Sequence, residues 1–147
     1  MEPTARTTGS LSESYGESLL TAAREARERA WCPYSKFRVG VALLTESGLI
    51  FSGCNVENAS FGLTICAERT AAVKAVSEGH HVFTAMAVVT ESDKPLLPCG
   101  ACRQFLAEFG LDLPIVAEGI GGTRIETSLR DLLPAAFTPS DLPAPKA

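Results

Sequence analysis

Two short cysteine motifs constrain this sequence more than any other feature. They are Cys66-Ala67-Glu68-Arg69 and Pro98-Cys99-Gly100-Ala101-Cys102. A Cys-x-x-Cys pair places two sulfur atoms within reach of one metal ion, Cys66 offers a third thiolate, and sulfur ligands suit Zn²⁺. Structural zinc sites are closed by four protein ligands, whereas catalytic sites keep one position open for water. The three cysteines therefore predict an open zinc site with one ion per chain.

Glu68 gives this site its predicted chemistry. It follows Cys66 by two residues, so its carboxylate can manage the protons of a water molecule at the open position. Zinc deaminases of nucleobases share this pattern, in which a His or Cys is followed by x-Glu and later by Pro-Cys-x-x-Cys, with the Glu as acid and base rather than ligand. The spacing thus predicts that Glu68 is catalytic.

Length and charge narrow the classes of protein that remain. A chain of 147 residues with 46% hydrophobic content predicts a single domain over residues 1–147, with a core that needs no disulfide support. The chain has no apolar run of about 18 residues and no signal pattern at its start, so we expect a cytoplasmic protein without a membrane partner. The net charge of -4 and the lack of a Lys/Arg block disfavour a nucleic-acid partner and favour a small uncharged substrate.

The other potential ligands are two cysteines and two histidines. Five cysteines are an odd number, which disfavours a complete disulfide framework. Cys32 and Cys54 are expected to be small buried residues. The alternative is that one of them is a fourth ligand, which would make the chain a non-catalytic structural zinc module. His80 and His81 follow Gly79 between a helix and a strand, so we expect them in an exposed turn.

Helical and strand patterns alternate along the chain. Helices are predicted from Ser10 or Ser14 to about residue 30, over 66–79 and 99–109, and as a short turn at 129–133, and strands over 37–44, 49–53, 82–90, 113–117 and 124–126. Residues 55–65 are predicted to form a loop. This alternation favours an α/β sheet covered on both faces. Residues 1 to about 10 are expected to be disordered, and the tail after about residue 138 to be loose.

Further motifs make the sequence similar to small homotetrameric cytidine deaminases. Besides the two cysteine motifs, the resemblance rests on Pro-Tyr-Ser-Lys-Phe-Arg-Val-Gly at 33–40, Gly-Cys-Asn-Val-Glu-Asn at 53–58 and Glu-Thr-Ser-Leu-Arg-Asp-Leu-Leu-Pro at 126–134. It covers nearly the whole chain. It implies a three-layer α/β/α fold with a mixed five-stranded sheet. It also implies zinc-dependent hydrolytic deamination of cytidine and 2′-deoxycytidine to uridine and 2′-deoxyuridine, with release of ammonia, in pyrimidine salvage.

The resemblance also implies which residues bind substrate. Asn55 and Glu57 match a pair that hydrogen-bonds the ribose 3′-hydroxyl, and Phe37 matches an aromatic residue at the nucleoside pocket. The backbone at Ala67 and the carbonyl of Cys99 match groups that read the edge of the base. Without the resemblance, Asn55 and Glu57 would be interpreted as turn residues and Phe37 as part of the core.

Three more residues are implied to support or complete the site. Arg69 matches an arginine that hydrogen-bonds the ligand sulfurs in family members with three cysteines. Phe137 matches a C-terminal aromatic residue that reaches into a neighbouring subunit, which implies a homotetramer with shared active sites. Phe61 stands where many relatives have tyrosine, so any hydrogen bond of that hydroxyl is lost here.

The sequence favours free nucleosides over two other substrates and over a purely structural role. A related zinc deaminase acts on the nucleoside antibiotic blasticidin S, but the Asn55-x-Glu57 pair and Phe137 favour plain nucleosides. Deamination of a polynucleotide is disfavoured because the chain is short and acidic. A structural zinc module would leave Glu68 without a role.

Overall fold

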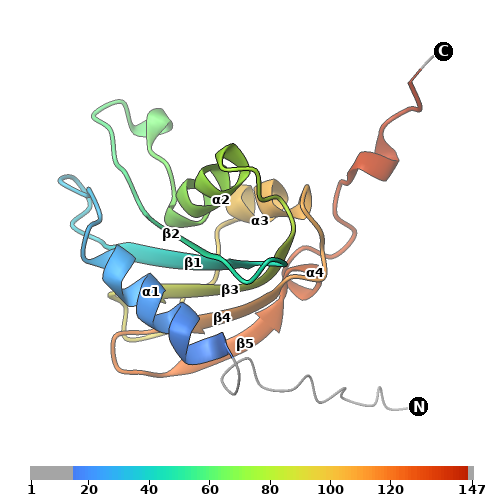
Figure 1. Cartoon of the computed structure of the whole chain (residues 1–147). Helices are drawn as coiled ribbons and strands as arrows, with labels where there is room; N and C mark the ends of the chain where they lie inside the picture. Colours follow the sequence, from blue (N-terminus) through green and yellow to red (C-terminus); the bar gives the residue numbers. More distant parts are fainter. Residues whose placement is uncertain (1–14, 146–147) are drawn as a thin grey trace.

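A mixed five-stranded sheet forms the centre of the molecule (Figure 1). The computed structural model describes residues 15–145. The strands are β1 (Val39–Thr45), β2 (Ile50–Cys54), β3 (Phe83–Thr90), β4 (Pro114–Glu118) and β5 (Arg124–Ser128), in the order β2-β1-β3-β4-β5. Only the β3 and β4 pair is parallel within this sheet, and the other neighbours are antiparallel. The predicted mixed sheet of five strands is confirmed.

Helices cover both faces of the sheet. Figure 1 shows α1 (Glu17–Arg27) across one face, and α2 (Ala67–Ser77) and α3 (Gly100–Ala107) side by side on the other. A short helix, α4 (Leu129–Leu132), follows β5, and 3₁₀ turns occupy Phe61–Leu63 and Pro139–Asp141. Within residues 15–145, no helix is long and apolar enough to cross a membrane. The three-layer arrangement agrees with the predicted α/β/α fold.

The strand period of two divides the core into two apolar clusters. Val41 and Leu43 of β1 face α2 and α3, whereas Ala42 and Leu44 face α1. β3 follows the same alternation, and its last six residues are all buried. A strand covered on both faces reads as a continuous apolar run, which is why β1 and β3 were recognisable in the sequence.

Glycines let the helices approach the sheet closely. A Cβ atom added at Gly53 of β2 would lie 2.5 Å from the backbone nitrogen of Ala71 in α2, and one added at Gly40 of β1 would lie 2.5 Å from that of Arg27 in α1. Any larger residue at Gly53 would push α2 away from the sheet. The close contact holds the N-terminal end of α2, which carries Cys66 and Glu68, against β2 and β1.

Most predicted elements are confirmed, with differences at their ends. The predicted helix starts at Ser10 and Ser14 lie outside the described residues, and α1 ends at Arg27 rather than near residue 30. β1 starts at Val39 rather than at residue 37, because the side chain of Asn55 bonds the backbone there in place of a neighbouring strand. The predicted loop 55–65 contains the 3₁₀ turn Phe61–Leu63.

Candidate active site

The three motif cysteines meet where α2 and α3 begin. Cys66 is the N-cap residue of α2, Cys99 is the N-cap residue of α3, and Cys102 lies in the first turn of α3. Their sulfur atoms all lie within 4.8 Å of one another. The partial positive charge at a helix N-terminus favours thiolates, which are the form of cysteine that binds metal.

This group of sulfurs fits a zinc ion. Four ligands about 2.3 Å from a tetrahedral zinc ion lie about 3.8 Å from one another, so the cysteines need only a small side-chain adjustment to converge on one ion. In the described part of the chain, neither Cys32 nor Cys54 belongs to this group or to another potential metal cluster. A closed site with four cysteines is therefore not supported. Among the described residues, His80 is not part of the cysteine group either. Its ring packs against Phe51, with ring centroids 5.3 Å apart.

Glu68 lies buried beside the sulfurs. Only 6% of the residue is exposed, and its Oε2 accepts a hydrogen bond from the Sγ of Cys102 at 3.6 Å. Burial is the main cause that raises the pKa of the Glu68 carboxyl above its usual range. A carboxyl group in this environment can hold a proton and release it, which is what an acid and base catalyst must do.

The charges around the sulfurs favour thiolate at Cys66. The neighbouring Cys102 thiol, assisted by a hydrogen bond from Arg69, lowers the pKa of the Cys66 thiol to about 5, and the neighbouring Cys66 in turn raises the pKa of Cys102. Arg69 Nη2 donates to Cys66 Sγ at 3.5 Å, while its buried Nε has no hydrogen-bond partner within the described residues. Three thiolates around a divalent ion leave a net negative charge and more acceptors for Arg69, so its guanidinium also fits a metal-loaded cluster.

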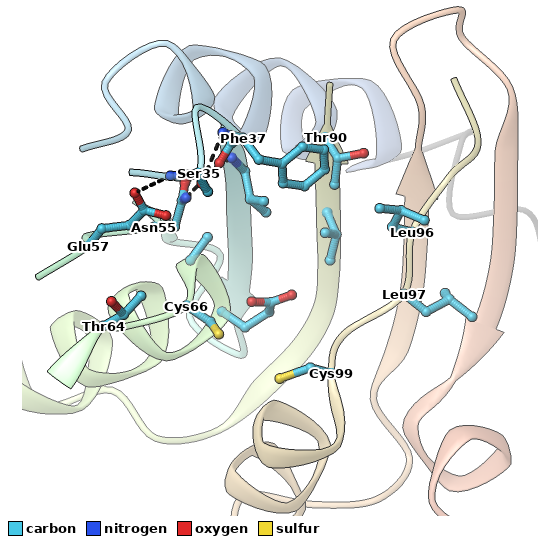
Figure 2. A pocket seen from close by; sticks show the side chains of 14 residues that line it. Ser35, Phe37, Asn55, Glu57, Thr64, Cys66, Thr90, Leu96, Leu97 and Cys99 are labelled. Atoms are coloured by element: carbon cyan, nitrogen blue, oxygen red, sulfur yellow. Dashed lines mark hydrogen bonds between the residues drawn. The ribbon is translucent and has the colours of Figure 1, made fainter. Parts of the chain in front are cut away.

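A cavity of about 290 Å³ opens beside the cysteines (Figure 2). Seven of the residues singled out in the sequence line it, namely Phe37, Asn55, Glu57, Cys66, Ala67, Glu68 and Cys99. They come from the segment before β1, the segment directly after β2 and the starts of α2 and α3. The volume is close to the lower limit for small-molecule sites in proteins.

Asn55 and Glu57 line this cavity and also fix the backbone of the segment before β1, which forms part of its wall. The Asn55 side chain accepts a hydrogen bond from Val39 N at 2.9 Å and donates one to the carbonyl of Phe37 at 2.8 Å. Glu57 Oε1 accepts bonds from the backbone nitrogens of Tyr34 and Ser35 at 3.0 and 3.1 Å, and Figure 2 draws the bond from Ser35 as a dashed line. Hydrogen bonds, first from the Ser35 side chain, lower the pKa of Glu57. Both residues therefore fix the segment that presents Phe37.

Phe137 does not line the cavity of its own chain. It is 59% exposed, and its carbonyl accepts a hydrogen bond from Gln104 Nε2 at 2.8 Å. Its place in a neighbouring subunit stays a prediction. Phe61 is 74% exposed and packs edge-on against Tyr34, with ring centroids 5.7 Å apart.

Leu96 and Leu97 also line the cavity, although they lie in the connection between the strand predicted over 82–90 and the helix predicted over 99–109. Figure 2 shows them on the segment that leads into Cys99. Ser35, Val39, Thr64, Val88 and Thr90 complete the lining. The one available signal was a pair of leucines in an otherwise polar loop, immediately before Pro98 and Cys99.

Known proteins resemble the chain over most of its length. The family model described as "Cytidine and deoxycytidylate deaminase zinc-binding region" matches residues 14–118. A cytidine deaminase of Sporosarcina psychrophila is 50% identical over 127 residues, which are 86% of this chain and 93% of the relative. A probable cytidine deaminase of Dictyostelium discoideum is also 50% identical, over 86% of each chain.

The fold agrees with these matches. The crystal structure of cytidine deaminase from Burkholderia pseudomallei is similar to this structure with a TM-score of 0.80 and 51% identity, over 82% of this chain and 98% of that one. The matched region contains both cysteine motifs and Glu68. The chain therefore belongs to the cytidine and deoxycytidylate deaminase family.

Proposed function

We propose that this protein is a zinc-dependent hydrolase that converts cytidine and 2′-deoxycytidine to uridine and 2′-deoxyuridine and releases ammonia, in pyrimidine salvage. The observation that carries the proposal is the buried Glu68 carboxyl beside three converging cysteine sulfurs in the wall of a small cavity. Family membership and the 50% identity to cytidine deaminases support cytidine over blasticidin S.

Cys66, Cys99 and Cys102 would hold the zinc ion, with Arg69 donating hydrogen bonds to their sulfurs. Zinc supplies a water molecule that is activated at neutral pH. Glu68 accepts a proton from this water as its oxygen forms a bond to C4 of cytosine, and it passes the proton to N3. Glu68 would then take the second proton from the new hydroxyl group at C4 and transfer it to the amino group as the bond from C4 to nitrogen breaks, so that a carbonyl forms at C4 and ammonia departs.

The other residues in the cavity wall would position the nucleoside. The backbone of Ala67 and the carbonyl of Cys99 would bind the polar edge of the base, and Phe37 would contact the nucleoside. Asn55 and Glu57 would hydrogen-bond the ribose 3′-hydroxyl through donor and acceptor positions that their bonds to the backbone do not use. The lining contains two carboxylates, Glu57 and Glu68, and no lysine or arginine, which supports an uncharged nucleoside rather than a phosphorylated one.

The single domain would act as a cytoplasmic homotetramer in which Phe137 enters a neighbouring active site. The exposed ring of Phe137 supports this assembly, because it leaves its own cavity without an aromatic residue from the C-terminal segment. Exposed apolar side chains between β2 and α2, Phe61 and Leu63 among them, offer further surface that neighbours would bury.

A substrate panel tests the proposal. The zinc-loaded protein is assayed by ultraviolet absorbance with cytidine, 2′-deoxycytidine, deoxycytidylate and blasticidin S. Turnover of both nucleosides with a much lower kcat/KM for deoxycytidylate is expected. Turnover of blasticidin S alone would show that this antibiotic, and not cytidine, is the substrate. A preference for deoxycytidylate would contradict the inference from the negative charge of the cavity.

A further inference from the structure

Arg103 follows the predicted ligand Cys102 but makes contacts of a different kind. Its Nε donates to the carbonyl of Pro98 at 2.7 Å, and its Nη1 donates to the carbonyl of Leu132 at 3.0 Å. Pro98 is buried and directly precedes Cys99. One guanidinium thus joins the residue before a zinc ligand to the last residue of α4.

No carboxylate neutralises this guanidinium within residues 15–145, because none of the ion pairs there includes Arg103. Its charge instead strengthens the two bonds to carbonyl oxygens, since hydrogen bonds from an ionised donor are about twice as strong as neutral ones. The planar fork of arginine lets one side chain serve both oxygens, which the single ammonium of lysine does poorly. Arg103 is therefore suited to hold two backbone segments at a fixed separation.

The Pro98 carbonyl belongs to the peptide group that enters Cys99. Anchoring this oxygen fixes the orientation of the Pro98–Cys99 peptide plane and hence the direction in which the Cys99 side chain leaves the backbone. Cys99 needs this support most, because it is the exposed member of the cysteine group, whereas Cys102 is buried.

The second carbonyl connects the same residue to the C-terminal segment. Leu132 ends α4, five residues before Phe137. The next residue of α3, Gln104, bonds the carbonyl of Phe137 at 2.8 Å. Three consecutive residues of α3 thus belong to the cysteine cluster (Cys102), bond the base of the C-terminal segment (Arg103) and bond the segment itself (Gln104), and α3 and α4 contact each other.

We propose that Arg103 is a positioning residue of the zinc centre. It holds Cys99 in its ligand geometry and ties that geometry to the segment that carries Phe137. The effect on zinc rests on the three-cysteine cluster, and the effect on substrate rests on the function proposed above.

Zinc release tests this role without using the reaction. The zinc-loaded wild type, Arg103→Ala, Arg103→Lys and Arg130→Ala are mixed with an excess of a chromogenic chelator, and the release rate is followed by absorbance. Arg130 is the matched control, because it is an exposed arginine of α4 whose partner is the exposed Asp112. Removing a group that supports a metal ligand costs about 10- to 100-fold in metal affinity, so Arg103→Ala should release zinc at least about tenfold faster than wild type and Arg130→Ala.

Arg103→Lys keeps the charge but reaches one carbonyl, so its release rate should lie between those of wild type and Arg103→Ala. A wild-type rate in folded Arg103→Ala, or an equal acceleration in Arg130→Ala, would overturn the proposal. If Arg103→Ala does not fold, a wild-type rate in Arg103→Lys overturns it instead.

Steady-state assays with cytidine then test the second half of the role. Under saturating zinc, Arg103→Ala should raise KM severalfold more than it lowers kcat, because the C-terminal segment loses its anchor while Glu68 stays in place. An unchanged KM would overturn the link to Phe137. A protein without any turnover of cytidine would refute the proposed function, and the release rates would still decide the effect on zinc.

Discussion

Replacing Glu68 by glutamine should abolish turnover and leave the zinc centre intact. Glutamine has the same shape but cannot accept and return a proton. One acid or base catalyst contributes about 10²- to 10⁴-fold, and Glu68 is proposed to serve several transfers in one cycle, which places the expected loss of kcat at the upper end, about 10⁴-fold. At about 1.4 kcal/mol per factor of ten, this corresponds to about 5.5 kcal/mol of barrier.

The burial of Glu68 leaves little opportunity for another group to replace its proton transfers. With 6% of the residue exposed, bulk water and buffer have little access to take over its proton transfers. The glutamine should fit without strain, because within residues 15–145 the only side-chain bond that it replaces is the weak one from Cys102 at 3.6 Å. The free energy of unfolding of the zinc-loaded variant should therefore change by less than about 1 kcal/mol.

The assay combines kcat for cytidine with zinc content and a urea titration. Glu57→Gln is the control, because Glu57 is the other carboxylate of the cavity and contacts backbone nitrogens rather than sulfur. It should raise KM more than it lowers kcat. A Glu68→Gln protein that keeps its zinc and retains kcat within tenfold of wild type would refute the role of Glu68.

Three further changes test other parts of the account. Glu118→Gln removes a buried carboxylate that accepts bonds from Arg24 and Arg124 at 2.8 Å, and should lower the free energy of unfolding by about 1.5–3 kcal/mol at pH 7 in a urea titration. Because these arginines, Arg24 first, lower the pKa of Glu118 below 4.5, its contribution is complete above about pH 4.5 and disappears as the pH falls through the folded-state pKa; a gap between wild type and variant that persists at lower pH would contradict this. Cys54→Ala should keep both zinc and activity, and loss of the metal would indicate that Cys54 is a fourth zinc ligand. Phe61→Tyr should lower KM for cytidine modestly if the hydroxyl contributes across subunits, and an unchanged KM would show that it is dispensable.

The metal cluster was predictable because short-range spacing carries most of it. Cys99 and Cys102 are three residues apart, so one helical turn brings their sulfurs together whatever the rest of the fold. Glu68 likewise reaches the cluster from the first turn of the helix that Cys66 caps. Spacing within each motif could not predict that the starts of α2 and α3 lie side by side, because this is a tertiary contact. The combined signature of Cys-x-Glu with Pro-Cys-x-x-Cys did predict it.

Contacts to the backbone were not predictable in the same way. Asn55 bonds the main chain at Phe37 and Val39, and Arg103 bonds the carbonyls of Pro98 and Leu132. Every residue has the same backbone carbonyl acceptor. The amino-acid type of the partner therefore does not reveal that its backbone accepts such a bond. The sequence could name Asn55 as a polar residue of the site, but only the fold reveals that it holds the cavity wall.

The strands were predictable from their apolar runs, and their ends were not. β1 begins at Val39 although the apolar pattern starts at Phe37, because a side chain rather than a strand pairs with the backbone there. Leu96 and Leu97 lie between a predicted strand and a predicted helix, where no periodic pattern marks them, yet they line the cavity. Loop residues gain such roles from the elements that position them, which local patterns do not encode.

The most direct test of the central claim is an ultraviolet assay of cytidine turnover before zinc removal, after zinc removal and after reloading, with metal content measured on each sample. The account predicts about one zinc per chain, loss of uridine formation when the metal is removed, and recovery when it is restored. Tightly held zinc without turnover of cytidine or 2′-deoxycytidine would contradict an open catalytic site, as would full turnover by metal-free protein.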